Sequence, residues 1–312
     1  MRLLLRASSE TSWLRPFREE FPDVEIAEIR GNLLNREVCE RACHGVSIVY
    51  HLAAGRGQKS YPDAFLNSVV TTRNLIASLE NSDSLRRFVN VSSMAVYEVQ
   101  GRRIINEDCP VIKESHGVGE AYVYGKVKQD QLVLHWAEEK GFPYVIVRPG
   151  VVFGEGNHGL PGRVGIGTFG VFLHLGGSNR LPLTYVENCA DAIALAGVFD
   201  GIEGEVFNVV DDDCPTSRHL LKAFKKQVRP FSSIYAPYPV FYGFSWIWEK
   251  YSSWSDGQLP PIFNRRRCDL FWGRREYSNQ KVKSSLGWRP VVPMGEALDR
   301  YLSAARGDAK SA

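Results

Sequence analysis

Two side chains near the middle of the sequence could form a proton-transfer pair. Tyr124 and Lys128 open a predicted helix that runs to about Gly141, and their four-residue spacing puts both on one helical face. A phenol has a pKa of about 10 and is a poor base near neutrality, but a fixed positive charge favours the phenolate. The pair is therefore a candidate general acid/base. The overlapping pair Tyr122 and Lys126 has the same spacing, so the surrounding segments must support the choice.

Strands and helices alternate through the first half of the chain. This alternation predicts a parallel sheet with helices on both faces. The expected strands are 2–6, 24–29, 47–52, 87–93 and 144–148, and the expected helices are 11–21, 35–44, 63–79 and the one that Tyr124 opens. Ligands of such folds bind at the carboxyl ends of the strands, where Ser93, the run 51–54 and Arg148-Pro149 fall.

The second half of the chain is less regular. The run 154–170 holds seven glycines, which predicts a mobile loop over a cleft. We expect a nucleotide-binding core formed by 1–155 and 184–212, and a smaller substrate-binding lobe formed by 156–183 and 213–305. Residues 306–312 are expected to form a disordered tail.

Composition is that of an ordinary globular protein. Apolar residues make up 44% of the 312 residues, charged residues make up 23%, and the net charge of +3 is too mild to indicate nucleic acid as a partner. The six cysteines are scattered, which indicates reduced thiols in a cytoplasmic enzyme. Cys39, Cys43 and His44 lie close together but lack a fourth ligand in register, so no metal site is predicted.

Two local clusters leave alternatives open. The arginines at 265–267 and 274–275 could form a solvated loop or contact a phosphate of a cofactor or substrate. The aromatic stretch 231–254 could be core, the wall of a substrate pocket, or a surface that touches a membrane, and we favour core or pocket. No apolar run reaches the roughly 18 residues of a membrane span.

Several segments, in this order, resemble the extended short-chain dehydrogenase/reductase family, the NAD(P)-dependent epimerase/dehydratase group. The segments are Gly31-Asn32-Leu33, His51-Leu52-Ala53-Ala54, Val91-Ser92-Ser93, Tyr124-Gly125-Lys126-Val127-Lys128, Val147-Arg148-Pro149-Gly150 and Leu286-Gly287-Trp288. The resemblance runs from Met1 to about Pro290. It implies a Rossmann-type doubly wound parallel sheet, a small-molecule substrate, and a homodimer of the kind typical of the family.

The resemblance also implies roles for individual residues. Ser93 matches the hydroxyl that orients the substrate, Tyr124 the general acid/base, and Lys128 the residue that holds the nicotinamide ribose. The implied cofactor-binding residues are Arg6, Asn32, Leu33, Ala53, Ala54, Val91, Pro149 and Val152.

The beginning of the chain departs from the family pattern. The family starts with a strand, a Gly-x-x-Gly-x-x-Gly turn and a helix, whereas Met1 falls at what resembles the second strand. We expect that a lead-in of roughly 30 residues is missing, and that the neighbours of its mid-sheet strand have unpaired edges. The strings Gly154/Gly156/Gly159 and Gly165/Gly167/Gly170 do not sit in the required strand-to-helix turn.

Two further departures bear on cofactor and reaction. Arg6, Ser8 and Ser9 stand where an acid would bind the ribose of NAD, which favours NADP. Met94 and Ala95 replace the Asp-Glu pair of the family's sugar dehydratases, which disfavours dehydration. We therefore expect an NAD(P)-dependent oxidoreductase or epimerase acting on a secondary alcohol or ketone of a nucleotide-linked sugar or a steroid-like molecule. The alternatives are a non-catalytic dinucleotide-binding relative and a truncated inactive fragment.

Overall fold

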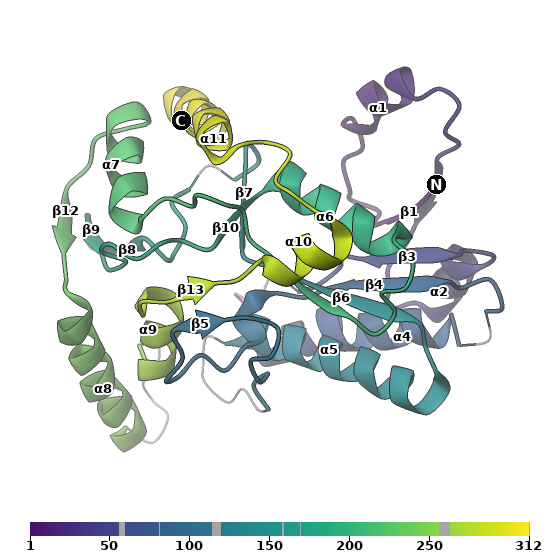
Figure 1. Ribbon diagram of the computed structural model, residues 1–312, viewed down its shortest axis with the longest axis horizontal. Coiled ribbons are helices and arrows are strands. Elements are labelled where there is room, and N and C mark those ends of the chain that lie inside the picture. The colour runs from purple at the N-terminus through teal and green to yellow at the C-terminus, as the bar shows by residue number, and fades with distance from the viewer. Residues whose placement is uncertain are drawn as a thin grey trace.

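A four-stranded parallel sheet lies at the centre of the molecule (Figure 1). The computed structural model describes residues 1–55, 60–80, 82–113, 120–157, 159–168, 170–255 and 263–311. The strand order is β11-β6-β4-β3, formed by Val206–Val209, Tyr144–Pro149, Arg87–Val91 and Ile48–His51. This arrangement confirms the predicted doubly wound α/β fold, and it brings the carboxyl ends of the four strands to one edge.

Helices cover both faces of this sheet (Figure 1). One face carries α2 (Arg36–Cys43), α4 (Thr71–Ala77) and α5 (Ala121–Lys140), and the other carries α6 (Val186–Val198) and α10 (Gln280–Leu286). Successive strand residues point to opposite faces, so Phe88 packs toward α4 and α5 while Val89 packs toward α6. Burial on both faces explains why these strands are continuous apolar runs rather than alternating ones.

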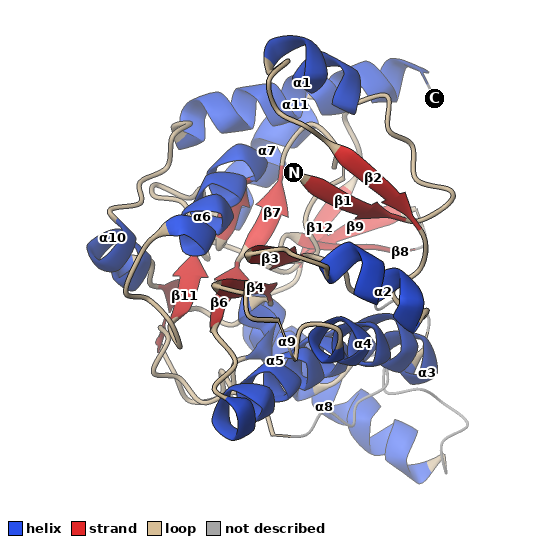
Figure 2. Cartoon of the chain, turned by 90° about the vertical axis from the view of Figure 1, so that its right-hand side faces the viewer, coloured by secondary structure: helices blue, strands red, loops and turns tan. Residues whose placement is uncertain are grey.

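The first two strands form a separate sheet. β1 (Arg2–Leu5) and β2 (Ala27–Arg30) pair with each other in parallel, and α1 (Leu14–Glu20) connects them in the chain (Figure 2). Among the described residues, neither strand pairs with β3. In the described part of the chain, β1 pairs with β2 alone and β3 pairs with β4 alone. The side chain of Arg2 ties this sheet to the end of α2 by donating to the carbonyls of Ala42 and His44 at 2.9 and 2.7 Å.

The second half of the chain builds the other end of the molecule (Figure 1). Its strands are β7 (Val151–Phe153), β8 (Gly165–Thr168), β9 (Val171–His174), β10 (Leu183–Tyr185), β12 (Ser233–Tyr235) and β13 (Glu276–Tyr277), the last pairing with β5 (Ile104–Ile105). Its remaining helices are α7 (Ser217–Gln227), α8 (Tyr238–Trp254), α9 (Arg265–Trp272) and α11 (Met294–Ser311).

Two sequence-based expectations need correction here. The glycine-rich run 154–170 is not one loop, because 165–168 form β8, which pairs with β9 in antiparallel register. The predicted disordered tail instead continues α11 as far as Ser311, since Ala304, Ala305 and Ala309 favour a helix.

Some residues of the aromatic stretch pack inside the fold, and at least one arginine of the cluster forms an ion pair within it. Phe241 of α8 is buried against Trp272 of α9 with ring centroids 5.2 Å apart, whereas Trp246 and Trp254 are exposed. Arg265 pairs with Glu249 across the same two helices. Among the described residues, no helix is both long enough and apolar enough to cross a bilayer.

A glycine inside α5 sets how closely that helix approaches its neighbour. A methyl group added at Gly125 would lie 2.9 Å from the Ser68 hydroxyl oxygen of the π-helical segment η1 (Phe65–Val70), which follows α3 (Tyr61–Ala64). Ser68 in turn accepts a hydrogen bond from the backbone N–H of Gly55 at 2.9 Å. This close contact fixes the rotation of α5 about its own axis, and therefore decides which of its side chains face the sheet.

The core between the sheet and α5 allows a stability test. Phe88 is fully buried, and its ring lies 5.4 Å from that of Phe142, so Phe88→Ala should lower the free energy of unfolding by about 3–5 kcal/mol. Phe199 is 39% exposed, and Phe199→Ala should change it by less than about 1 kcal/mol. Urea titrations of both variants check this, and equal losses would contradict the assignment of the core.

Candidate active site

A cavity of about 430 Å³ opens beside the carboxyl ends of β4 and β6. Ser93, the N-cap of the short helix η2 (Met94–Val96), lines one wall, and Tyr122 from the first turn of α5 lines another. Apolar groups make up much of the remainder, including Met94, Val151 and Phe271. The cavity therefore places two hydroxyl groups within a mainly apolar surface, which is the usual character of a small-molecule site.

The two hydroxyl groups line the same cavity. Burial raises the pKa of the Tyr122 phenol, and an interaction with Ser93 lowers it by a smaller amount. The net shift of this pKa is upward, so the phenol is protonated at neutral pH and can donate a proton. Chemically, the pair can hold an alcohol or carbonyl oxygen between them and exchange a proton with it.

Lys126 follows Tyr122 by one helical turn and is almost completely buried. Its ammonium donates to the carbonyl of Val91, the last residue of β4, at 2.6 Å. Burial lowers the pKa of Lys126 to about 8, and the charge of Asp130 acts in the opposite direction. A buried amine with a lowered pKa, one helical turn from a phenol, is the kind of pair that was predicted at Tyr124 and Lys128.

Asp130 organises the ends of two strands beneath this site. Its carboxylate, 1% exposed, accepts from the amide of Asn90 at 2.9 Å, from the hydroxyl of Ser92 at 3.0 Å and from the guanidinium of Arg148 at 2.9 Å. Burial raises the pKa of Asp130, although Arg148 and Ser92 pull it down. Arg148 also lies 4.7 Å from the centroid of the Tyr97 ring. The network joins α5 to the ends of both β4 and β6.

The structure does not bring the predicted tyrosine and lysine to the Ser93 cavity. Tyr124 points instead to Tyr61 of α3, with ring centroids 5.2 Å apart, and is not among the residues that line the Ser93 cavity. The ammonium of Lys128 donates to the side chain of Gln131 at 2.9 Å in an exposed position. Two residues along an α-helix rotate a side chain by about 200°, so only one of the overlapping pairs can face the sheet.

A sequence signal for the pair that faces the sheet, Tyr122 and Lys126, was present. Lys126 is followed four residues later by Asp130, so a cation and an anion share one helical face, and Arg148 ends the next strand. A single charge is rarely buried, because burial without a partner is costly. Several charges on the helix face that packs on a sheet therefore indicate a buried network of paired charges.

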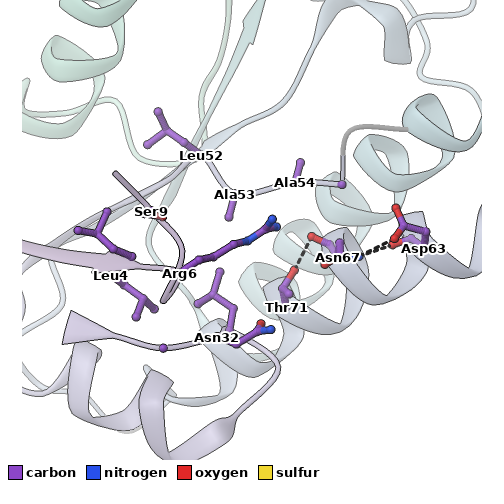
Figure 3. Close-up of a pocket in the computed structure, with 14 residues that line it drawn as sticks. Leu4, Arg6, Ser9, Asn32, Leu52, Ala53, Ala54, Asp63, Asn67 and Thr71 are labelled. Atoms are coloured by element: carbon purple, nitrogen blue, oxygen red, sulfur yellow. Dashed lines mark hydrogen bonds between the residues drawn. The ribbon is translucent and has the colours of Figure 1, made fainter. Parts of the chain in front are cut away.

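A second cavity, of about 710 Å³, lies at the carboxyl ends of β1, β2 and β3 (Figure 3). The predicted cofactor-binding residues Arg6, Asn32, Leu33, Ala53 and Ala54 all line it. Figure 3 shows Arg6 extending across the cavity toward the side where Asn67 and Thr71 stand on the helix wall. Its mixture of a cation, amides and small apolar groups suits a nucleotide.

The remaining predicted cofactor-binding residues lie nearer the first cavity. Pro149 and Val152 line it together with Ser93, and the carbonyl of Val91 receives the ammonium of Lys126. Gln129, which follows Lys126 on α5, donates to the carbonyl of Ala53 at 3.0 Å. The helix that carries the proton-transfer pair is therefore hydrogen-bonded directly to the wall of the second cavity.

The lowered pKa of Lys126 predicts a pH-dependent stability. Between pH 8 and 10.5 the folded protein has released the Lys126 proton while the unfolded chain retains it, so the free energy of unfolding rises with pH through this window. Lys126→Met has no such proton. The free energy of unfolding of the wild type, relative to that of Lys126→Met, should therefore increase by about 3 kcal/mol at most across this pH window. Urea titrations of both proteins at pH 7 to 10.5 measure the difference, and a constant difference would contradict a buried ammonium.

Comparisons with known proteins identify relatives of this chain. Curated relatives include a sterol-4-alpha-carboxylate 3-dehydrogenase, decarboxylating, of Bos taurus, 23% identical over 91% of this chain and 82% of that protein. Another is the N-acetyl-alpha-D-glucosaminyl-diphospho-ditrans,octacis-undecaprenol 4-epimerase of Escherichia coli O157:H7, 27% identical over 89% of this chain and 83% of that protein. A third is the 2-alkyl-3-oxoalkanoate reductase of Stenotrophomonas maltophilia, 26% identical over 91% of this chain and 88% of that protein.

Solved structures share the fold. UDP-glucuronic acid 4-epimerase from Bacillus cereus in complex with NAD superposes with a TM-score of 0.68 at 16% identity, covering 99% of this chain and 90% of the other. RMD from Pseudomonas aeruginosa complexed with NADPH gives 0.65 at 15% identity, covering 98% and 99%. The model of the NAD dependent epimerase/dehydratase family matches residues 5–209, which is more than half of the sequence. The chain belongs to the NAD-dependent epimerase/dehydratase family and is an enzyme of the extended short-chain dehydrogenase/reductase type.

Proposed function

We propose that this protein transfers a hydride between a nicotinamide dinucleotide and a secondary alcohol or ketone, with Ser93, Tyr122 and Lys126 as its catalytic residues. The observation that carries the proposal is the meeting of the Ser93 and Tyr122 hydroxyls in one cavity, with Lys126 buried one helical turn further along. A hydride can leave a carbinol carbon only as the hydroxyl proton leaves as well, and these hydroxyls are placed to handle that proton.

Each residue has a separate task in this proposal. The Ser93 hydroxyl fixes the substrate oxygen, and the Tyr122 phenol gives a proton to a carbonyl or takes one from an alcohol. The Lys126 ammonium stabilises the phenolate whenever it forms, because both side chains occupy one face of α5. Asp130 keeps that ammonium charged, since its carboxylate raises the pKa of Lys126.

The residues present fit a nicotinamide dinucleotide. Arg6, Asn32 and Leu33 would hold the adenosine end in the larger cavity, and Pro149 and Val152 would border the nicotinamide end. When bound, the dinucleotide supplies or accepts the hydride. We favour NADP over NAD, because a guanidinium at Arg6 suits a 2′-phosphate.

The names of the relatives support a substrate that combines a hydroxyl or keto group with an anionic group. The three named above act on a sterol carboxylate, a diphospho-undecaprenol and an oxoalkanoate. Met94 and Ala95 line the cavity where the family's dehydratases carry an Asp-Glu pair, so oxidation, reduction or epimerisation is favoured over loss of water.

The proposal predicts a difference between two neighbouring tyrosines. Tyr122→Phe should lower turnover by roughly 100-fold or more, because it removes the proton-transfer group, with little change in affinity for NADPH. Tyr124→Phe, on the opposite side of the helix, should retain most of the activity. Transfer of deuterium from 4-deuterated NADPH to 3-oxodecanoate or a 3-ketosteroid, followed by mass spectrometry, measures both. Equal transfer by the wild type and Tyr122→Phe would exclude the proposal and favour a non-catalytic binding protein.

A second prediction concerns the preference for NADP. Arg6→Ala should weaken NADPH binding by about 10-fold or more while changing NADH binding less than about 3-fold, since only NADPH carries the 2′-phosphate. Fluorescence titration with each dinucleotide measures the affinities without turnover. Arg36→Ala, which removes an exposed arginine paired with Glu40, is the matched control. Equal losses for both dinucleotides would show that Arg6 does not select NADP.

A further inference from the structure

Arg163 brings a charge into the Ser93 cavity that no carboxylate of the described residues neutralises. Its side chain is about nine-tenths buried, and Nη1 donates to the carbonyl of Leu270 at 2.7 Å and to the hydroxyl of Tyr277 at 2.9 Å. Among the described residues no ion pair involves it, and its two side-chain hydrogen bonds both come from Nη1, which leaves Nε and Nη2 available to a ligand. A buried charge normally requires an opposite charge, because removing it from water is costly.

The nearby acids are already engaged. Asp269 of α9 pairs with Arg275 at 2.6 Å, and Glu120, which lines the same cavity, pairs with Arg266 at 2.5 Å. Both carboxylates therefore form their ion pairs with arginines other than Arg163.

A second arginine lines the same wall, and aromatic rings flank both guanidinium groups. Arg267 lines the cavity too, and its guanidinium lies 5.7 Å from the centroid of the Phe271 ring, the same distance as that of Arg163. The ring of Tyr277 lies 5.2 Å from the Arg163 guanidinium on another side. The rings and the hydrogen bonds hold the planar guanidinium in one orientation, which favours recognition of a flat, bidentate oxyanion.

We infer that Arg163 binds an oxyanion carried by the substrate, so that the substrate class is an apolar alcohol or ketone bearing a carboxylate or phosphate. This inference rests on the proposed function, because it places the oxyanion in the cavity that holds Ser93 and Tyr122. The rest of the lining, which includes Val123, Val151 and Leu270, would contact the apolar body. Binding of the oxyanion at Arg163 would fix the orientation of the substrate relative to the two hydroxyls.

Calorimetric titration in the presence of NADPH tests this inference with matched probes. The wild type should bind 3-hydroxydecanoate about 10-fold or more tightly than its methyl ester, which lacks the charge. Arg163→Gln should reduce this preference to within about 2-fold, and Arg163→Lys, which keeps the charge and one donor to Leu270, should retain part of it. Arg180→Gln, at a different surface cavity, should keep the full preference.

The outcomes separate the two sources of the oxyanion. UDP-glucose, which carries phosphates on a polar body, is titrated in parallel. If Arg163→Gln loses binding of UDP-glucose but not the preference for the carboxylate, the oxyanion at Arg163 is a phosphate. Loss of the preference for the carboxylate would assign a carboxylate on an apolar body. If neither probe depends on Arg163 while thermal melting shows that the variant is folded, the inference is overturned. Because heat of binding requires no turnover, that result would leave the test of Tyr122 unaffected.

Discussion

One buried carboxylate holds the candidate active site together. Asp130 gathers the amide of Asn90, the hydroxyl of Ser92 and the guanidinium of Arg148, and thereby joins α5 to the ends of β4 and β6. Breaking a buried ion pair by removing one partner costs about 3–5 kcal/mol, because the other charge stays buried. This network therefore specifies the position of α5 relative to the sheet, and with it the position of Tyr122 and Lys126.

The sequence predicted the elements of the sheet better than the rotation of one helix. Buried strands such as 87–91 and 144–149 are short apolar runs with clear ends, so their order and the parallel topology could be inferred. The helix 121–140 is covered on several sides and carries apolar residues around much of its circumference, so its pattern did not show which tyrosine faces the sheet. The contact between Gly125 and Ser68, and the Asp130 network, decide this rotation, and both depend on residues distant in sequence.

The larger cavity is lined by residues that follow strands of two separate sheets. β1 and β2 form a two-stranded sheet, which is marginally stable alone, and β3 has an exposed edge with Leu52 60% exposed just beyond it. A ligand that contacts both Arg6 and Ala53 would bridge the two sheets, and any ligand that binds only the folded state stabilises that state. Binding at this cavity and the stability of the N-terminal sheet are therefore linked.

The chemistry available at the smaller cavity is narrow. Glu120 is the one carboxylate among the described residues that line it, and Arg266 holds it in an ion pair. The ion pair with Arg266 engages this carboxylate, so it is not free to contact a leaving hydroxyl. Met94 and Ala95 cannot transfer protons at all. Proton exchange through Tyr122 is then the step that the lining supports, and it serves hydride transfer in either direction, because a neutral phenol protonates a carbonyl and a phenolate deprotonates an alcohol.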